Sequence, residues 1–241
     1  MIGTAAFIIE DDLNLPAEEA YKVLRTNILF CGIKKPIKTL SITSNGSGEG
    51  KTTTSINLAV SVAKSGKKAL LVDADMRKPA SCKQFGDNGE KGLSSLISNN
   101  ATLDEVIKKT NISNLYFIAC GPKPPNAAEL VGASEFNRFV ETVREQFDMV
   151  IIDTPPLGSV IDSAIIASQT DGSILVIETN SVSHKHVVRI KEQLEKANAR
   201  VLGVVLNKMN KSEYKNYYNN YNYYGGTKEL KSGWFKKLRN K

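Results

Sequence analysis

The stretch TSNGSGEGKTTT, residues 43–54, decides how the rest of this sequence is interpreted. Its glycines would let the backbone wrap closely around a phosphate chain, and amide groups at the start of a following helix would point at the anion. Lys51 is placed to reach the terminal phosphates, and the hydroxyl of Thr52 can bind Mg²⁺. The strict phosphate-loop pattern has a glycine at Asn45, and here the glycine falls one residue later, at Gly46. The alternative, a glycine-rich turn with a chance Gly-Lys-Thr, is disfavoured by its position between an apolar run and a helical pattern.

Short apolar runs, rich in β-branched residues, recur on both sides of this loop. Each is apolar on both faces, which is typical of strands buried in a parallel sheet. Segments 53–66 and 185–199 have apolar residues three and four positions apart, as crossover helices do. The alternation predicts an α/β fold with a doubly wound, mostly parallel sheet of the P-loop NTPase type, whose ligand binds at the carboxyl ends of the strands. The predicted strands cover residues 39–43, 68–73, 115–119, 148–153, 172–178 and 200–207.

Three aspartates lie at the ends of two of these strands: Asp73 and Asp75 in LLVDADMRKP, and Asp153 in VIIDTPP. In a parallel sheet all three would project from the same edge as the phosphate loop. A magnesium nucleotide needs carboxylates there, one to hold the metal through water and another to orient or deprotonate a nucleophile. A single aspartate at a strand end can also be a helix cap, but three beside a phosphate loop favour a metal and catalytic site.

The segment LNKMN, residues 206–210, bears on the choice of base. A guanine-binding motif of the N-K-x-D kind would have an aspartate at Asn210, so adenine is expected, with Asn207 near the nucleotide. Alternatively, Asn207 and Lys208 only end a strand. The predicted nucleotide-binding residues are Gly46, Ser47, Gly48, Glu49, Gly50, Lys51, Thr52, Thr53 and Asn207.

The length of 241 residues, with 41% hydrophobic and 24% charged, suits one globular domain. No apolar run approaches the roughly 18 residues of a membrane span, and the start of the chain lacks a secretory signal, so a cytoplasmic location is expected. Cys31, Cys82 and Cys120 are far apart and odd in number, which favours buried small residues over a disulfide framework or a zinc site. His184 and His186 have no third ligand type near them in the sequence, so a metal role is disfavoured.

The end of the chain has a different composition. Six tyrosines lie within YKNYYNNYNYY, residues 214–224, and no aliphatic residue lies between Met209 and Leu230. We therefore expect a globular domain over 1–209 and a flexible tail over 210–241. The net charge of +7 is concentrated in this tail, because residues from 211 onward hold eight Lys and Arg against two Asp and Glu, a balance of +6. A basic tail indicates an acidic partner, either nucleic acid, an anionic membrane or an acidic protein groove.

Three interpretations of the tyrosines are open on composition alone. They could form a self-associating tract, stack on single-stranded nucleic acid, or be hydroxyls that are modified. A parallel last strand ending near Asn207 would release the tail at the edge that carries the phosphate loop. The next ten residues, to Tyr217, could span about 33 Å when extended, which permits modification both within a chain and between chains.

The blocks GEGKT, LLVDADMRKP and VIIDTPP, followed by a tyrosine-rich tail, resemble the bacterial tyrosine kinases (BY-kinases) that govern capsule and exopolysaccharide synthesis. The resemblance extends from EEAYKVLRTNI, residues 18–28, through GPKPPNAAEL, residues 121–130, to the tail. It is to the free-standing cytoplasmic form, in which the kinase is separate from its transmembrane activator. The sequence departs from the family at Ser47, where proline is usual.

The resemblance implies an ATP-dependent protein-tyrosine kinase that uses Mg²⁺, autophosphorylates its tyrosine cluster in trans and regulates capsular or exopolysaccharide synthesis. The implied catalytic residues are Lys51, Asp73, Asp75 and Asp153, and the implied metal ligands are Thr52 and the same three aspartates. Asp73 is favoured as the residue nearest the reacting phosphate, but the sequence does not divide the base and metal functions among the three aspartates. The implied phosphate acceptors are Tyr214, Tyr217, Tyr218, Tyr221, Tyr223 and Tyr224.

The resemblance also implies partners. A homo-oligomeric ring is expected to form through an N-terminal helix of about residues 16–30, where Glu19, Lys22 and Arg25 match the family's ring-contact motif with lysine in place of one arginine. A transmembrane activator would recruit the kinase to the inner face of the membrane through its cytoplasmic tail. A protein-tyrosine phosphatase would reset the tail, and no specific nucleic acid is expected.

Partitioning and cell-division ATPases are the alternative class. They share the fold and the aspartate blocks, but act as nucleotide-switched dimers on DNA or membrane. They typically carry a signature lysine at the start of the phosphate loop, where this sequence has Ser44, Asn45 and Gly46. The absence of that lysine disfavours this class, and a cluster of six tyrosines has no function in it.

Overall fold

The computed structural model of the chain describes residues 15–79 and 90–209. The helices and strands given below belong to a compact unit that ends at Lys208. The predicted acceptor tyrosines, from Tyr214 to Tyr224, and Cys82 lie outside the described residues. None of the helices within the two described ranges combines the length and the apolar character that a membrane span requires.

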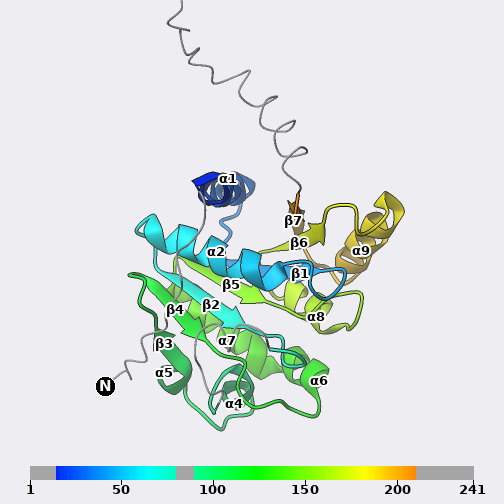
Figure 1. Cartoon of the computed structure of the whole chain (residues 1–241). Helices are drawn as coiled ribbons and strands as arrows, with labels where there is room; N and C mark the ends of the chain where they lie inside the picture. Colours follow the sequence, from blue (N-terminus) through cyan, green and yellow to red (C-terminus); the bar gives the residue numbers. More distant parts are fainter. Residues whose placement is uncertain (1–14, 80–89, 210–241) are drawn as a thin grey trace, which may run out of the picture. The chain divides into compact units, whose positions relative to one another are not determined.

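One sheet of seven strands, in the order β3-β4-β2-β5-β1-β6-β7, forms the centre of the described part of the chain (Figure 1). Its strands are β1 Thr39–Ser44, β2 Ala69–Asp73, β3 Ile107–Lys109, β4 Leu115–Ile118, β5 Met149–Asp153, β6 Gly172–Glu178 and β7 Val201–Asn207. Every neighbouring pair is parallel except β3 and β4, which are antiparallel. The fold class is confirmed, and each of the six predicted strands is present to within one residue at either end. The antiparallel β3 was not predicted.

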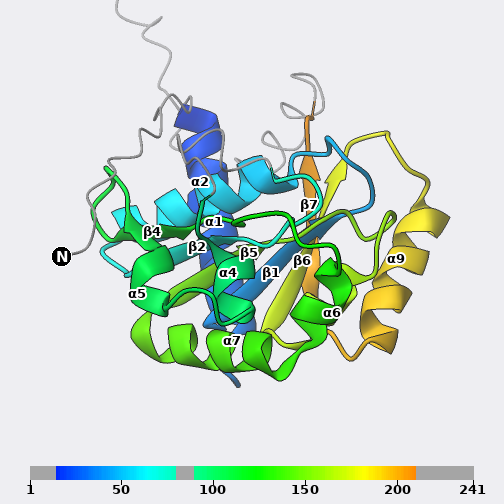
Figure 2. The same cartoon turned by 90° about the horizontal axis from the view of Figure 1, so that it is seen from below.

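Helices cover both faces of this sheet (Figures 1 and 2). They are α1 Leu15–Cys31, α2 Lys51–Lys64, α4 Leu93–Ile97, α5 Leu103–Val106, α6 Ala127–Gly132, α7 Ser134–Gln146, α8 Asp162–Ser168 and α9 His184–Lys196. The helices α1 and α2 share an apolar cluster with one face, and the remaining helices pack in two clusters on the other. The predicted crossover helices are α2 and α9, and the predicted N-terminal helix is α1.

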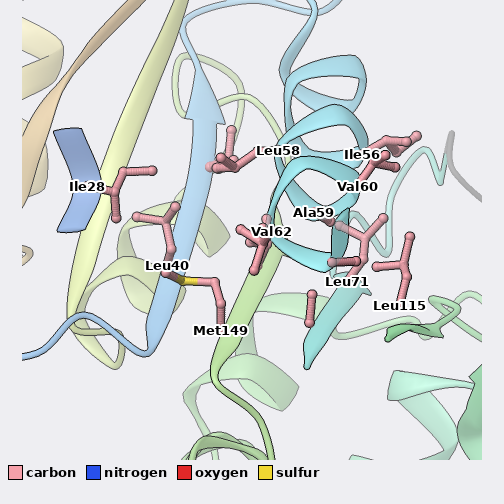
Figure 3. Packing of buried hydrophobic residues seen from close by; sticks show 14 of the residues in the cluster. Ile28, Leu40, Ile56, Leu58, Ala59, Val60, Val62, Leu71, Leu115 and Met149 are labelled. Atoms are coloured by element: carbon pink, nitrogen blue, oxygen red, sulfur yellow. The ribbon is translucent and has the colours of Figure 1, made fainter. Parts of the chain in front are cut away.

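The strands of the centre are buried on both faces, which explains their unbroken apolar sequences. On the side of α1 and α2, Leu40 of β1 belongs to one cluster with Ile28 of α1, Leu58 and Val62 of α2, and Met149 of β5 (Figure 3). Fully burying a side chain of this size stabilises the fold by about 1.5–3 kcal/mol. Residues of the opposite parity on β2 and β5 belong to a second cluster with the helices of the other face, so neither face of the central strands is available to water.

The direction of the strands places the carboxyl ends of the parallel strands at one edge of the sheet. Asp153, at the end of β5, pairs in register with Asp73 of β2 and with Ile42 of β1. Asn207, at the end of β7, pairs with Glu178 of β6. The phosphate loop, the aspartates and the end of β7 therefore meet at this edge, as the sequence predicts for a parallel sheet.

The expectation that the cysteines are buried is correct for Cys120 and wrong for Cys31, which is exposed. Cys31 is the last residue of α1, where the helix leaves the apolar cluster that covers Ile28. Its carbonyl oxygen accepts a hydrogen bond from the guanidinium of Arg200 at 2.7 Å. The backbone of Cys31 thus contributes to the fold, while its side chain faces water.

Candidate active site

The phosphate loop lies between the end of β1 and the start of α2, as predicted. Gly50, the residue before α2, has a φ of 94° in the left-handed region, which favours glycine. A Cβ atom at Gly50 would also collide with the side-chain amide nitrogen of Asn207. That amide nitrogen donates a hydrogen bond to the carbonyl oxygen of Glu49 at 2.9 Å. The end of β7 is therefore fastened directly to the phosphate loop, and only glycine fits between them.

The departure of this loop from the strict glycine pattern has a structural reason. The backbone amide of Asn45 donates to the buried carboxylate of Glu49 at 2.8 Å. The Asn45 side-chain oxygen lies 2.9 Å from Nε2 of His186 on α9, and because an amide oxygen only accepts, the imidazole nitrogen donates. Asn45 thus joins the loop to a helix on the opposite face of the sheet, which a glycine could not do.

Lys51 and three of the predicted side chains form one hydrogen-bonded network. The Lys51 ammonium lies 3.1 Å from Oδ2 of Asp75 and 3.8 Å from Oδ2 of Asp153. The Thr52 hydroxyl donates to Oδ2 of Asp153 at 2.6 Å, and the hydroxyl of Ser55 donates to its Oδ1 at 3.1 Å. The structure brings together Lys51, Thr52, Asp75 and Asp153, and sequence reasoning missed Ser55, one helical turn after Lys51.

Asp73 occupies a different position in the same group. It is fully buried, and its Oδ1 accepts the backbone amide of Asp75 at 3.0 Å. The hydrogen bond holds the turn that follows β2, so that the Asp75 carboxylate reaches Lys51. Asp73 is thus close to the network through the backbone, and Asp75 is the residue of this pair whose carboxylate is hydrogen-bonded to the ammonium.

Burial and charge perturb two groups of the network. Burial raises the pKa of Asp153, although the charge of Lys51 and the hydrogen bonds from Thr52 and Ser55 oppose this rise. For Lys51, burial lowers the pKa, but the negative charges of Asp153 and Asp75 outweigh burial and raise it. Lys51 is accordingly a fixed cation, and Asp153 is a carboxylate that its partners must keep charged.

The donor set fits a magnesium nucleotide. Loop amides and Lys51 suit phosphate oxygens, and the oxygens of Thr52, Asp75 and Asp153 are hard ligands of the kind that Mg²⁺ binds. Among the described residues, no three side chains of His, Cys, Asp or Glu converge as they do in an all-protein metal site. Mg²⁺ usually completes its shell with water and phosphate oxygens, so the predicted set of three aspartates is not needed as direct ligands.

An ion pair that sequence reasoning missed joins two segments of the site. Nε of Arg77 lies 2.8 Å from Oδ2 of Asp162, and Nη2 of Arg77 lies 3.0 Å from Oδ1 of Asp162. Arg77 follows Asp75 by two residues, and the buried Asp162 begins α8, the helix after Asp153. The bidentate pair ties together the two segments that carry the acidic residues. The block LLVDADMRKP contains Arg77, but nothing in the sequence indicates a partner 85 residues away.

The predicted ring-contact residues lie on α1. The Lys22 ammonium is 2.8 Å from Glu19 and 3.3 Å from Glu18, on the exposed side of the helix. Arg25 is half-buried and donates to the backbone oxygen and the hydroxyl of Ser61 on α2. Glu19 and Lys22 are therefore available to a partner, whereas Arg25 holds α1 against α2.

The fold and this site define a P-loop nucleotide-binding enzyme, and the family model described as AAA domain matches residues 37–208. Tyrosine-protein kinase CpsD of Streptococcus agalactiae is 44% identical over 196 residues, covering 81% of this chain and 85% of that protein. Tyrosine-protein kinase YwqD of Bacillus subtilis is 37% identical over 210 residues, covering 86% of each. The crystal structure of the chimerical protein CapA2B2 superposes with a TM-score of 0.79 at 35% identity, covering 88% of this chain and 93% of that one. The chain belongs to the bacterial tyrosine kinases, and it is a protein-tyrosine kinase.

The alternative class shares the fold. The septum site-determining protein MinD from Pyrococcus horikoshii, solved with Mg-ADP, superposes with a TM-score of 0.63 at 25% identity, covering 73% of this chain and 72% of that one. Both its TM-score and its identity are lower than those of CapA2B2. The comparison supports nucleotide binding, and the closer relatives are kinases.

Proposed function

We propose that this kinase uses ATP and Mg²⁺ to autophosphorylate its C-terminal tyrosine cluster in trans, and that it regulates capsular or exopolysaccharide synthesis. The observation that carries the proposal is the hydrogen bond between Asn207 and Glu49. Through it the last strand of the described residues, β7, ends against the phosphate loop, and Tyr214 follows seven residues later in the sequence. Support for the pathway comes from the kinases CpsD and CapB among its relatives.

The residues of the network divide the reaction between them. Thr52, Asp75 and Asp153 would hold Mg²⁺, which, when bound, neutralises charge on the phosphates. Lys51 would neutralise the terminal phosphate. A phenol has a pKa near 10 and is a weak nucleophile at neutral pH, so it needs a carboxylate to accept its proton. We assign this function to Asp73, which ends β2 in register with Asp153 at the edge of the sheet that carries the phosphate loop.

The helix α1 supports assembly with further copies. Its outward side exposes apolar residues that no described element covers: Val23, Leu29 and Phe30, followed by Ile33 after the helix, with exposures of 49, 59, 65 and 78%. Together with Glu19 and Lys22 they form a mixed apolar and charged surface that suits a second copy of the chain. Transfer in trans requires an assembly of this kind.

The remaining partners are proposed from the family to which the chain belongs. A transmembrane activator would stimulate the kinase through its cytoplasmic tail and recruit it to the inner face of the membrane, and a protein-tyrosine phosphatase would reset the tail. We propose no specific nucleic acid as a partner. If the isolated kinase were fully active, and no such membrane protein changed its activity, the proposal of an activator would be contradicted.

The test of the function is intact-mass analysis after incubation of the pure protein with ATP and Mg²⁺. A ladder of added phosphates is expected, whereas nucleotide hydrolysis without added mass would indicate a switch ATPase. For transfer between chains, Lys51→Met protein with its tyrosines is mixed with active protein whose six tail tyrosines are Phe. Phosphate on the Lys51→Met chain supports the trans reaction. If none is transferred while the wild type modifies itself at high dilution, the reaction is in cis.

A further inference from the structure

A cavity of about 450 Å³ opens beside the phosphate loop, between the loop and α9. Asn45 and Gly46 of the loop form one wall, and Gly158 and Ser159, which follow β5, form another. The amide of Gly158 donates to the carbonyl oxygen of Asn45 at 3.0 Å, so these two walls are fixed to each other. The volume lies within the roughly 300–1,000 Å³ that ligand pockets occupy. We call this cavity the α9 pocket.

The third wall is one side of α9, and the side chains that line it are positive or neutral. His186, Arg189 and Gln193 line it, together with the buried Ile190. Arg189 is exposed, and no ion pair within the described part of the chain involves it. Its guanidinium is therefore open to a ligand that enters the pocket.

Arg189 takes part in no ion pair within the described residues, although the exposed Glu192 follows it by three residues on the same helix. Lys191, on the same helix, is neutralised by Glu195 at 2.5 Å, and Arg189 has no such neighbour among the described ion pairs. The first turn of α9 contains no acidic residue that could neutralise Arg189 from that side. The nearest carboxylate of the loop, Glu49, is buried and turned toward the backbone of Asn45, and it is not among the residues that line the pocket.

This arrangement favours an anion over a cation or a neutral phenol. An exposed guanidinium and an amide side chain are groups that bind phosphate oxygens in proteins, whereas the donating nitrogen of His186 is already bound to Asn45. The tail has a balance of +6 before modification, and each phosphotyrosine adds about −1.5 to −2. Within residues 211–224 the balance is only +1, from Lys211 and Lys215 against Glu213, so an unmodified tyrosine brings no negative charge and the pocket would favour a phosphorylated one.

We infer that the α9 pocket binds a phosphotyrosine in the tail of a second copy of this chain. The inference rests on the proposed phosphorylation of the tail. Gly46 belongs both to the wall of the pocket and to the phosphate loop, so the pocket adjoins the site of phosphate transfer. Neighbouring acceptors such as Tyr214, Tyr217 and Tyr221 are three or four residues apart, which is about 10–14 Å of extended chain. A docked phosphotyrosine would hold the next acceptor near the site, so phosphates would accumulate on one tail before a second tail is used.

The direct test is peptide binding, which needs no kinase activity. A labelled synthetic peptide of residues 212–226, with phosphate on Tyr217 or without it, is titrated against the full chain whose six tail tyrosines are Phe. Saturating Mg-ADP is present, so that the phosphate loop is filled. The phosphopeptide should bind at least about tenfold more tightly, as expected for charge-assisted hydrogen bonds. Equal affinities for the two peptides, or binding that Mg-ADP abolishes, would overturn the inference.

Two variants assign the binding to the pocket. Arg189→Gln should remove most of the preference for the phosphopeptide, and Lys185→Gln, an equal change of charge on an exposed residue of the same helix outside the pocket, should not. Equal losses in both variants would reduce the effect to general charge and contradict the site. Phenyl phosphate should compete at lower concentration than inorganic phosphate, and the reverse order would assign the pocket to free phosphate instead.

A second measurement follows the consequence. At low conversion, the wild type should show chains with several phosphates beside unmodified chains, and Arg189→Gln should show mainly single phosphates. Identical mass distributions for the wild type and Arg189→Gln would show that the pocket does not cause phosphates to accumulate on one tail. If the protein binds the phosphopeptide but never phosphorylates itself, the inference about the pocket stands and the proposed function is refuted. The failure of the pocket and the failure of the proposed function are therefore distinguishable.

Discussion

Lys51 and Arg189 lie on two sides of the same phosphate loop, but their surroundings differ. Lys51 is buried and held by two carboxylates of its own chain. Arg189 is exposed and, within the described residues, takes part in no ion pair. The first arrangement is complete in itself and has a fixed geometry, as a catalytic site requires. The second lacks a counter-charge, which a ligand would have to bring.

The largest effect should come from breaking the complete network. Lys51→Met leaves Asp75 and the buried Asp153 without their cation and removes the charge that would face the terminal phosphate. We expect the rate of phosphate transfer to fall by about a hundredfold or more. The rate is measured by intact mass with ATP and Mg²⁺, and the control is Lys67→Met, an exposed lysine after α2. Transfer within about tenfold of the wild type would show that Lys51 does not stabilise the reaction.

Two buried aspartates sharpen the contrast between a functional and a structural network. Asp153 serves Lys51 and Thr52, whereas Asp171 binds Arg144 at 2.8 Å and accepts the backbone amides of Lys38 and Thr39. Asp171→Asn should lower the free energy of unfolding by about 3 kcal/mol, because it leaves Arg144 with only the longer pair to the exposed Glu141, at 3.7 Å, and disturbs the acceptor of two backbone amides. Asp153→Asn should lose transfer activity by about a hundredfold and gain stability at neutral pH.

The sign of the Asp153 effect follows from its raised pKa. A carboxyl whose pKa is higher in the folded state than in the unfolded chain contributes stability below the unfolded pKa, and this stability is lost as pH rises through the folded pKa. The neutral amide has no charge to bury, so Asp153→Asn avoids the loss of stability that the wild type undergoes in this way as pH rises. Urea titrations of both variants at neutral pH and at about pH 4, near the ordinary pKa of an aspartate, check this. An Asp153→Asn protein that is less stable than the wild type at neutral pH would show that the partners of Asp153 outweigh its burial.

Much of this could be predicted from contiguous sequence, and the reason is physical. The strands and the helices α2 and α9 follow from local apolar periodicity, and a parallel sheet brings the carboxyl ends of its strands together without further information. The convergence of Lys51, Thr52, Asp75 and Asp153 followed from that rule alone. The three-residue β3 is too short to show a period, and it forms by pairing with the edge of β4.

The contacts that could not be predicted join residues far apart in the sequence. The hydrogen bond of Asn45 with His186 spans 141 residues, and the pair of Arg77 with Asp162 spans 85. Each depends on the order of the strands, which the sequence does not specify residue by residue. The orientation of Arg25 toward Ser61 is similar, since the helical pattern gives the face of α1 but not its rotation against α2.

A smaller effect is expected from Arg77→Gln, which breaks the link between the two acidic segments without touching the network. Transfer should fall about tenfold, because the turn that carries Asp75 loses its tie to α8. Stability should fall by only about 1 kcal/mol, since nearly half of the Arg77 side chain is exposed and its charge is screened. Arg138→Gln on the exposed side of α7 is the matched control. A stability loss with unchanged transfer would restrict Arg77 to a structural function.

The smallest effect, and the one that separates the two sides of the loop most finely, is expected from Asn207→Ala. This change removes the hydrogen bond to Glu49 and leaves the α9 pocket intact. One hydrogen bond contributes about 0.5–1.5 kcal/mol, so the KM for ATP should rise by about two- to tenfold with a smaller change in kcat. The affinity for the phosphopeptide in saturating Mg-ADP should stay within about twofold, because Asn207 does not line the pocket. Asn137→Ala, on the exposed side of α7, controls for loss of an amide. If Asn207→Ala weakened the phosphopeptide as much as ATP, the loop would transmit changes from one side to the other, and the two sites would have to be treated as one.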